Sequence, residues 1–301
     1  PAQVLNSLGN CYATLGRRGL AARYYRKAVD IRRRHFGADH PGVAAALENI
    51  GELHFDNGDY IAALDAFREA YGIQQTLHPA QSAPVASLQQ KMGLCYQYGG
   101  DFDRALALQL DAEKALSAAL GAAHPSMAGL LNNIGNCYVG KKDYAQAIAY
   151  YRKAEKVYQV SGQGKNPDVA LLYNNLGVSC LEQNNAPAAL AYFEKAEQIF
   201  RNSARTHPDF SISLKNKGLA LERIGKGQAA QAAFEQALRE DPGTDPVNKV
   251  EVLTDYGAVL CRRGIRNHDT VLLRQSLTVL ETALQFADSL RLQLTASAAR
   301  Q

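Results

Sequence analysis

Asparagine recurs at fixed distances from six regularly spaced glycines: Gly9, Gly51, Gly93, Gly135, Gly177 and Gly218. Counted from these glycines, which serve as position 0, the residues at −3, −2 and +1 include Asn6, Asn10, Asn49, Asn132, Asn133, Asn136, Asn174, Asn175 and Asn216. In a helix, asparagine is less favourable than alanine, glutamate or lysine by about half a kcal/mol per site, so helix stability does not explain them. An amide offers both donors and acceptors, and a row of amides could bind the backbone of an extended peptide. The alternative is that these amides bond neighbouring helices and hold one repeat to the next.

Acidic residues share this candidate peptide-binding face in the second repeat. Glu48, Glu52 and Asp56 are four residues apart and therefore follow one side of a helix. A basic side chain of a ligand would fit beside them, although simple solvation of an exposed face would produce the same line. Lys91, at −2 in the third repeat, completes the charged part of the predicted contact set.

Apolar residues occupy the corresponding positions of the fifth and sixth repeats. They are Leu171, Val178, Leu181, Ile212 and Leu219. Such a patch could hold an aliphatic or aromatic anchor of the ligand. Contact with the last helix of the chain would equally explain it.

Each glycine lies within a predicted pair of helices that positions these side chains. Apolar residues at −4, −1 and +3, such as Leu131, Ile134 and Tyr138, form one buried stripe on the first helix. At 100° per residue, positions −6, −3, −2, +1, +4 and +5 lie nearly opposite this stripe. Alanine at +12 and +19 marks the second helix, and glycine at the origin lets the two helices approach closely.

The glycines are spaced by 42, 42, 42, 42 and 41 residues, a period that indicates a solenoid of stacked repeats. We therefore predict an all-α chain whose helix-turn-helix repeats span about 1–41, 42–83, 84–125, 126–167, 168–208 and 209–242. A degenerate seventh repeat around Gly257 and a capping helix are expected in 243–294. There the turn is expected to be expanded through Arg262–Thr270. The tail 295–301 is expected to be disordered.

Turn and junction residues support these boundaries. Asp59, Asp101 and Asp143 are placed to cap the second helix of their repeats by accepting hydrogen bonds from free N–H groups. Proline recurs ten residues before the next glycine, which suits the first turn of a new helix. These prolines are Pro41, Pro125, Pro167 and Pro208.

Composition excludes several classes of protein. The net charge of +4 in 301 residues is too small to indicate a nucleic-acid binder, and no apolar run is long enough to span a bilayer. The basic run Arg17–Arg34 is interpreted as a solvated end of the array. Five cysteines occupy equivalent but distant positions, so we interpret them as small buried side chains in a reducing compartment, which favours a cytoplasmic location.

Catalysis has little support in the sequence. Histidines that precede proline, such as His40 and His207, are expected to be structural, and GQGK at 162–165 lacks the spacing of a phosphate-binding loop. No nucleophile motif or metal-ligand pair is present in the sequence. We therefore expect neither an enzyme nor a bound cofactor or metal.

The phrase L-x-N-N-I-G-x-x-Y, followed by D-Y-x-x-A and Y-Y-x-x-A, resembles the tetratricopeptide repeat. The longer period and the G-x-x-H-P junction resemble the 42-residue variety of kinesin light chains, and the resemblance covers about Gln3–Pro242. It implies an α-solenoid, a right-handed superhelix whose first helices line a concave groove that binds extended peptides through asparagines.

The expected partner is therefore a protein or peptide, with no nucleic acid and no membrane insertion. An alternative is a structural, sensor or self-association module of a larger multidomain protein.

Overall fold

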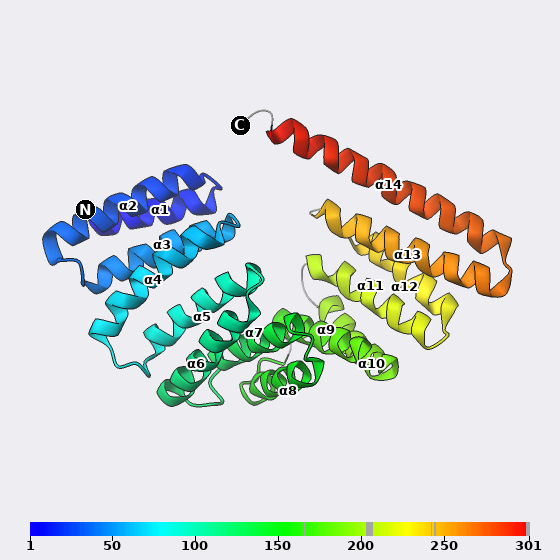
Figure 1. Ribbon diagram of the computed structural model, residues 1–301, viewed down its shortest axis with the longest axis horizontal. Coiled ribbons are helices and arrows are strands. Elements are labelled where there is room, and N and C mark those ends of the chain that lie inside the picture. Colours follow the sequence, from blue (N-terminus) through cyan, green and yellow to red (C-terminus); the bar gives the residue numbers. More distant parts are fainter. Residues whose placement is uncertain (165, 203–206, 242, 244, 299–301) are drawn as a thin grey trace. The chain divides into compact units, whose positions relative to one another are not determined.

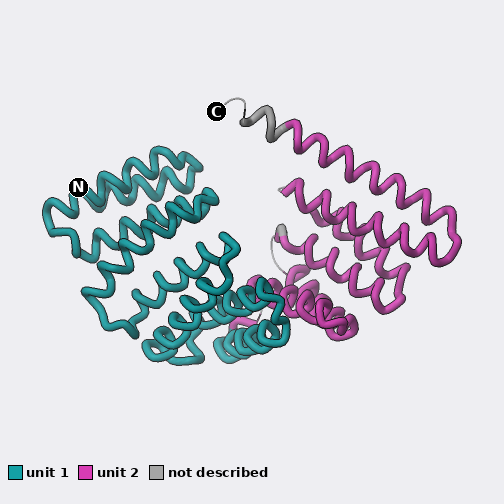
Figure 2. The backbone as a smooth tube through the Cα atoms, viewed as in Figure 1, with its two compact units in different colours: residues 1–162 teal, residues 163–301 magenta. Residues whose placement is uncertain are grey.

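The computed structural model describes residues 1–164, 166–202, 207–241, 243 and 245–298. Within these residues the chain forms fourteen helices and no strand, which confirms the all-α prediction (Figure 1). None of these helices has the length and apolar character needed to cross a membrane. The chain divides into two compact units, Pro1–Gly162 and Gln163–Gln301 (Figure 2). This division lies shortly before the limit predicted between the fourth and fifth repeats, at about residue 167.

Unit 1 contains four helix pairs. They are α1 (Ala2–Thr14) with α2 (Arg18–Phe36), α3 (Pro41–Asp56) with α4 (Tyr60–Leu77), α5 (Ala83–Tyr98) with α6 (Phe102–Leu120), and α7 (Ser126–Gly140) with α8 (Tyr144–Val160). Each odd-numbered helix packs on the even-numbered helix that follows it, and the even-numbered helices α2, α4 and α6 pack on the next odd-numbered helix. The six glycine-centred first helices are thus the odd-numbered helices of the structure.

Unit 2 contains three helix pairs. They are α9 (Pro167–Glu182) with α10 (Ala186–Arg201), α11 (Pro208–Arg223) with α12 (Gly227–Glu240), and α13 (Pro246–Asn267) with α14 (Thr270–Ala298). The odd-numbered helices α9, α11 and α13 also contact one another in succession. Side chains on the same face of successive odd-numbered helices are therefore neighbours.

The residue at +16 lies directly on each origin glycine. A Cβ atom built on Gly135 would lie 2.3 Å from Cε1 of Tyr151, and one built on Gly177 would lie 2.4 Å from Cε1 of Phe193. The alanines at +12 and +19 are fully buried in all six repeats; examples are Ala147 and Ala154. The prediction that glycine and alanine permit close approach of the paired helices is confirmed.

The turns within repeats share one backbone form. Position +7 has a positive φ in all six repeats and is glycine in four of them; Lys142 and Asn184 take it in the other two. The predicted caps are confirmed, because Asp59 accepts a hydrogen bond from the Ala62 N–H at 3.2 Å, and Asp101 and Asp143 accept equivalent bonds. At the junctions, His40 and His207 also act as caps, accepting from the N–H groups two residues ahead.

The seventh repeat differs from the prediction. Its expected expanded turn is instead helical, because α13 continues to Asn267 and only His268 and Asp269 separate it from α14. The insertion of about seven residues is shared between the two helices, so it lengthens each of them by about one turn and preserves their facing register. Gly257 lies against Leu280, and Gly264, seven residues later, lies against Leu273. The prediction of disorder is wrong for residues 295–298, because α14 continues through Ala298; residues 299–301 lie outside the described part of the chain.

Lys217 stands at −1, where the other repeats place leucine, isoleucine or methionine. Its Nζ donates to Glu197 Oε2 at 2.7 Å, and Glu197 also accepts from Arg201. Burial of Glu197 would by itself raise the pKa of its carboxyl, but the bonds from Lys217 and Arg201 outweigh burial and hold that pKa below its usual range. A half-buried ion pair thus links α10 and α11 at a position where the other repeats have an apolar side chain.

We expect Gly135→Ala to lower the free energy of unfolding by about 1–3 kcal/mol, because the new methyl group would overlap the buried Tyr151 ring. Gly129→Ala is the matched control: this glycine lies in the same helix, and a Cβ built there meets nothing within 4 Å. It should raise the stability by about 0.5–1 kcal/mol. Urea denaturation of both variants measures the difference, and equal effects would contradict the proposed contact.

The lowered pKa of Glu197 predicts a specific acid sensitivity. Its stabilising contribution is present above the ordinary carboxyl value of 4.5 and is lost as the pH falls through the lower folded-state pKa, because protonation releases Lys217. Glu197→Gln should be less stable than the wild type at pH 7, and the two should converge at low pH. Denaturant unfolding at a series of pH values tests this; parallel pH curves would exclude it.

Candidate functional site

Four of the predicted asparagines bond one another between repeats. Asn49 Nδ2 donates to Asn6 Oδ1 at 3.1 Å, and Asn216 Nδ2 donates to Asn174 Oδ1 at 3.0 Å. In both pairs, position −2 of one repeat meets position −3 of the repeat before it. These amides therefore hold repeat to repeat, and each bond uses only one polar group of each amide.

Two further asparagines satisfy buried tyrosines. The Tyr25 hydroxyl donates to Asn10 Oδ1 at 2.8 Å, and the Tyr151 hydroxyl donates to Asn136 Oδ1 at 2.7 Å. Burial raises the pKa of Tyr151 above its usual range, which keeps this hydroxyl a donor. Asparagine at +1 thus accepts a hydrogen bond from tyrosine at +16, across the helix pair.

The same rule explains three of the four repeats that lack asparagine at +1; the fourth, the third repeat of the chain, has Gln109 at +16 and Leu94 at +1. Where +16 is phenylalanine, as at Phe67, Phe193 and Phe234, no hydroxyl needs an acceptor, and +1 is glutamate, valine or leucine. Sequence reasoning missed this pairing, although the coincidence of Asn at +1 with Tyr at +16 was visible in the sequence.

The remaining predicted asparagines lie on two helices. Asn132 and Asn133 are on α7 beside Asn136, in unit 1, and Asn175 is on α9, in unit 2. All of them are half-buried.

The acidic line already has a partner within the chain. Lys91 Nζ lies 3.1 Å from Glu48 Oε2 and 2.6 Å from Glu52 Oε1. Burial would lower the pKa of Lys91, but its bonds to Glu52 and Glu48 outweigh burial and raise that pKa. The Lys91–Glu48 contact has the same −2 to −3 register as the two asparagine pairs. A basic ligand residue would therefore meet this internal ion pair and the exposed Asp56.

A cavity of about 210 Å³ adjoins the acidic line between α3 and α5. Its walls are Glu52, Phe55, Asp56, Phe67, Lys91 and Leu94. Three of these residues were predicted as ligand contacts. Phe55 and Leu94 were not, although they stand at +4 and +1 on the face that helical geometry places opposite the buried stripe.

Aromatic rings extend the cavity wall. The Phe55 ring lies 5.3 Å from the Tyr98 ring and 5.4 Å from the Tyr60 ring, both in edge-to-face geometry. The Tyr98 side chain remains 59% exposed. An apolar surface thus lies beside carboxylates on the predicted face of unit 1.

The apolar patch that was predicted in unit 2 to hold an anchor of the ligand is largely used for internal packing. Leu181 is only 5% exposed, so its prediction as a ligand contact was wrong: it lies in the core. Leu171 and Leu219 are half-buried and pack against the core cluster that contains Phe234. Val178 is also half-buried.

The cysteines were predicted to be small buried side chains, and the histidines that precede proline to be structural. Among the described residues, no group of three or more His, Cys, Asp and Glu side chains could hold a metal ion. Burial raises the pKa of Cys95 to about 11 and that of Cys137 to about 12, so these thiols stay protonated. Cys11 is exposed, which corrects the expectation that the cysteines are buried.

Comparison with known proteins identifies the repeat. The family model described as Tetratricopeptide repeat matches residues 1–76, 84–159, 126–202 and 168–239. Comparison with curated protein sequences gives no match.

Solved structures share the fold. BtubC (BKLC) from P. vanneervenii is 22% identical with a TM-score of 0.65, over 75% of this chain and 90% of that protein. The apo form of RapI is 16% identical with a TM-score of 0.68, over 96% and 99%. A putative kinesin light chain with TPR-like repeats from Podosopora anserina is 17% identical with a TM-score of 0.58, over 67% and 96%. At these identities the similarity shows the fold alone.

The tyrosine–asparagine pairing predicts non-additive mutations. Asn136→Leu alone should lower the free energy of unfolding by about 1–3 kcal/mol, because the buried Tyr151 hydroxyl loses its acceptor. Adding Tyr151→Phe should recover part of that loss, since the sixth repeat already combines leucine at +1 with phenylalanine at +16. A double-mutant cycle in urea measures the coupling. Additive effects would contradict the pairing.

Proposed function

Since this chain belongs to the tetratricopeptide repeat family, whose members are generally protein–protein interaction modules, we propose that it binds an extended segment of a partner protein. The ligand segment lies on unit 1, on the face of α1, α3 and α5 that carries positions −3, −2 and +1. The observation that carries this proposal is the cavity between α3 and α5, which combines an apolar wall with an acidic rim.

The cavity fits a lysine or arginine side chain. Phe55, Phe67 and Leu94 offer an apolar surface to the aliphatic stem. Glu48, Glu52 and Asp56 carry three negative charges against the single positive charge of Lys91, so the rim is negative. Lys91 itself lies 5.8 Å from the centre of the Phe67 ring and shows how a cation is accommodated there.

The amides of α1 and α3 supply contacts for the ligand backbone. Asn6 and Asn10 use Oδ1 in their internal bonds, and Asn49 uses Nδ2. The other polar group of each amide can therefore bond a peptide. The internal bonds also fix the side chains in advance, which reduces the conformational entropy lost on binding. These asparagines thus stabilise the stack of repeats through their internal bonds, and they offer their remaining polar groups to a ligand.

The chain acts as a non-enzymatic scaffold in this proposal. Its selectivity comes from one basic side chain in the cavity, and its backbone contacts tolerate different ligand sequences.

A random-peptide display selection on the full chain tests the function. We expect enriched peptides to share a lysine or arginine at one fixed position. Failure to enrich any peptide on folded protein, together with concentration-dependent assembly in light scattering, would instead favour a self-association module.

Binding of a selected peptide should weaken about tenfold in Asp56→Asn, because the exposed carboxylate at the rim is lost; a tenfold change corresponds to about 1.4 kcal/mol. Asp30→Asn is the matched control, since Asp30 is also an exposed helical aspartate of unit 1 but lies outside the cavity. Fluorescence anisotropy measures both affinities. Equal loss in the two variants would show a net-charge effect and would refute the cavity as the binding site.

A further inference from the structure

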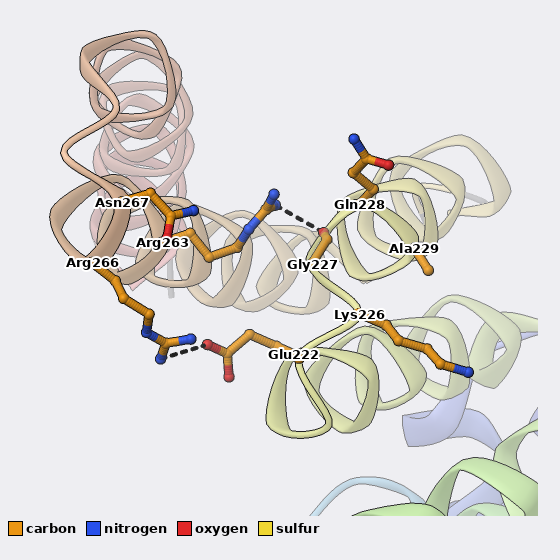
Figure 3. Close-up of a pocket in the computed structure, with 9 residues that line it drawn as sticks. Glu222, Lys226, Gly227, Gln228, Ala229, Arg263, Arg266 and Asn267 are labelled. Atoms are coloured by element: carbon orange, nitrogen blue, oxygen red, sulfur yellow. Dashed lines mark hydrogen bonds and ion pairs between the residues drawn. The ribbon is translucent and has the colours of Figure 1, made fainter.

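A second cavity, in unit 2, has the opposite charge. It measures about 530 Å³ and lies between the α11–α12 turn and the C-terminal end of α13 (Figure 3). Its walls are Glu222, Gly225, Lys226, Gly227, Gln228, Ala229, Arg263, Arg266 and Asn267. Three of these residues are cationic and one is anionic. We call it the α12–α13 cavity.

Two arginines of this region, Arg262 and Arg266, make only long ion-pair contacts within the chain. Arg262 and Arg266 approach Glu222 Oε1 at 3.9 and 3.8 Å, which is longer than a hydrogen bond, and their side chains are 52% and 64% exposed. Both share the Glu222 carboxylate, which cannot fully neutralise the two of them. Their exposed guanidinium groups therefore remain accessible to an external anion.

Arg263 is held in place by the fold. Its Nη1 donates to the Gly227 carbonyl at 2.8 Å, as Figure 3 shows. A Cβ built on Gly227 would lie 2.4 Å from Arg263 Nε, so the arginine side chain packs directly on this glycine. The cation is therefore packed over the first residue of α12.

Lys226 stands where four of the other five repeats have an aspartate or asparagine cap. Its backbone angles, φ −85° and ψ 59°, are close to those of Asp59, φ −86° and ψ 72°. Asp59 accepts from the N–H three residues ahead, whereas α12 has no side-chain cap. At this turn the sequence thus replaces a negative charge with a positive one.

The cationic groups are spread around the turn. In Figure 3 the Lys226 side chain extends away from Arg263 and Arg266, on the other side of the turn from them. A single small anion could not contact all three. An extended segment that carries several negative charges could.

We propose that the α12–α13 cavity and the adjoining Arg262 dock an acidic segment of a partner protein, with glutamate or aspartate carboxylates at Arg262, Arg266 and Lys226. Planar guanidinium groups bind carboxylates through two parallel hydrogen bonds. None of the described residues that line the cavity is aromatic, so it offers no stacking surface for single-stranded nucleic acid. This site is independent of the function proposed above, because it lies in the other unit and selects the opposite charge.

The probe for this site is a fluorescein-labelled decaglutamate peptide, titrated with the full chain in fluorescence anisotropy. We expect binding that weakens as salt is raised, as for partly exposed ion pairs. Lys226→Asp should weaken it at least tenfold. The same variant should keep or raise the thermal midpoint, because the new carboxylate can cap α12 as Asp59 caps α4.

Arg17→Asp is the matched control. Arg17 is the uncapped N-cap of α2 in unit 1, with φ −86° and ψ 63°, so the substitution makes the same change of charge at the same kind of position. Its affinity for decaglutamate should stay within twofold of the wild type. Equal weakening in both variants would show that net charge alone drives binding, and would overturn the site.

Further arms make the assignment specific. Unchanged decaglutamate binding in Lys226→Asp would overturn the proposal. If that variant has a lower thermal midpoint, Arg262→Gln combined with Arg266→Gln, which leaves the cap unaltered, should still weaken binding at least tenfold. Inorganic phosphate and a 20-nucleotide oligo-dT are tested beside the peptide. Tighter binding of either one, lost in the same variants, would overturn the assignment to an acidic protein segment.

Discussion

Each repeat depends on a side chain at +16 that lies directly on the glycine at the origin. The separation between a built Cβ and the covering group is at most 2.8 Å in all six repeats, so no larger residue fits without movement. Because interiors are close-packed, this contact sets the distance between the paired helices. The alanines at +12 and +19 extend the same close approach along the second helix. In the seventh pair, leucines cover Gly257 and Gly264 instead, with the contact doubled across the longer helices.

The identity of the covering group determines part of the candidate binding face. A tyrosine brings a buried hydroxyl that requires an acceptor, and Asn10 and Asn136 supply it. A phenylalanine makes no such demand, so position +1 is free to be Glu52, Val178 or Leu219. Polar residues on this face therefore have two roles. They accept hydrogen bonds from the buried tyrosine of their own repeat, and they stay partly exposed on the candidate binding face.

A second contact links successive repeats. In three pairs of successive repeats, position −2 meets position −3 of the preceding repeat, either as two amides or as a lysine and a glutamate. In the proposed binding mode, the neutral pairs keep polar groups for a peptide backbone, whereas Lys91 pairs with Glu48 beside an apolar cavity whose rim also carries Glu52 and Asp56. Variation at one structural position can thus alter ligand chemistry without altering how the repeats stack. In unit 2 a different position, the N-cap position of α12, carries Lys226 and contributes to a basic surface.

The sequence by itself determined the all-α fold, the helix pairs, the close glycine and alanine contacts and the aspartate caps. These features depend on residues near one another in the chain, or on a period that six copies repeat. Tertiary structure decided which asparagines bond each other, that Lys91 occupies the acidic line, and that Leu181 lies in the core. It also decided that the seventh repeat lengthens its helices rather than its turn. These outcomes depend on which side chains of neighbouring helices meet, although those side chains are far apart in the sequence. The packing of the helices determines these contacts, and the spacing of residues within one repeat does not specify them.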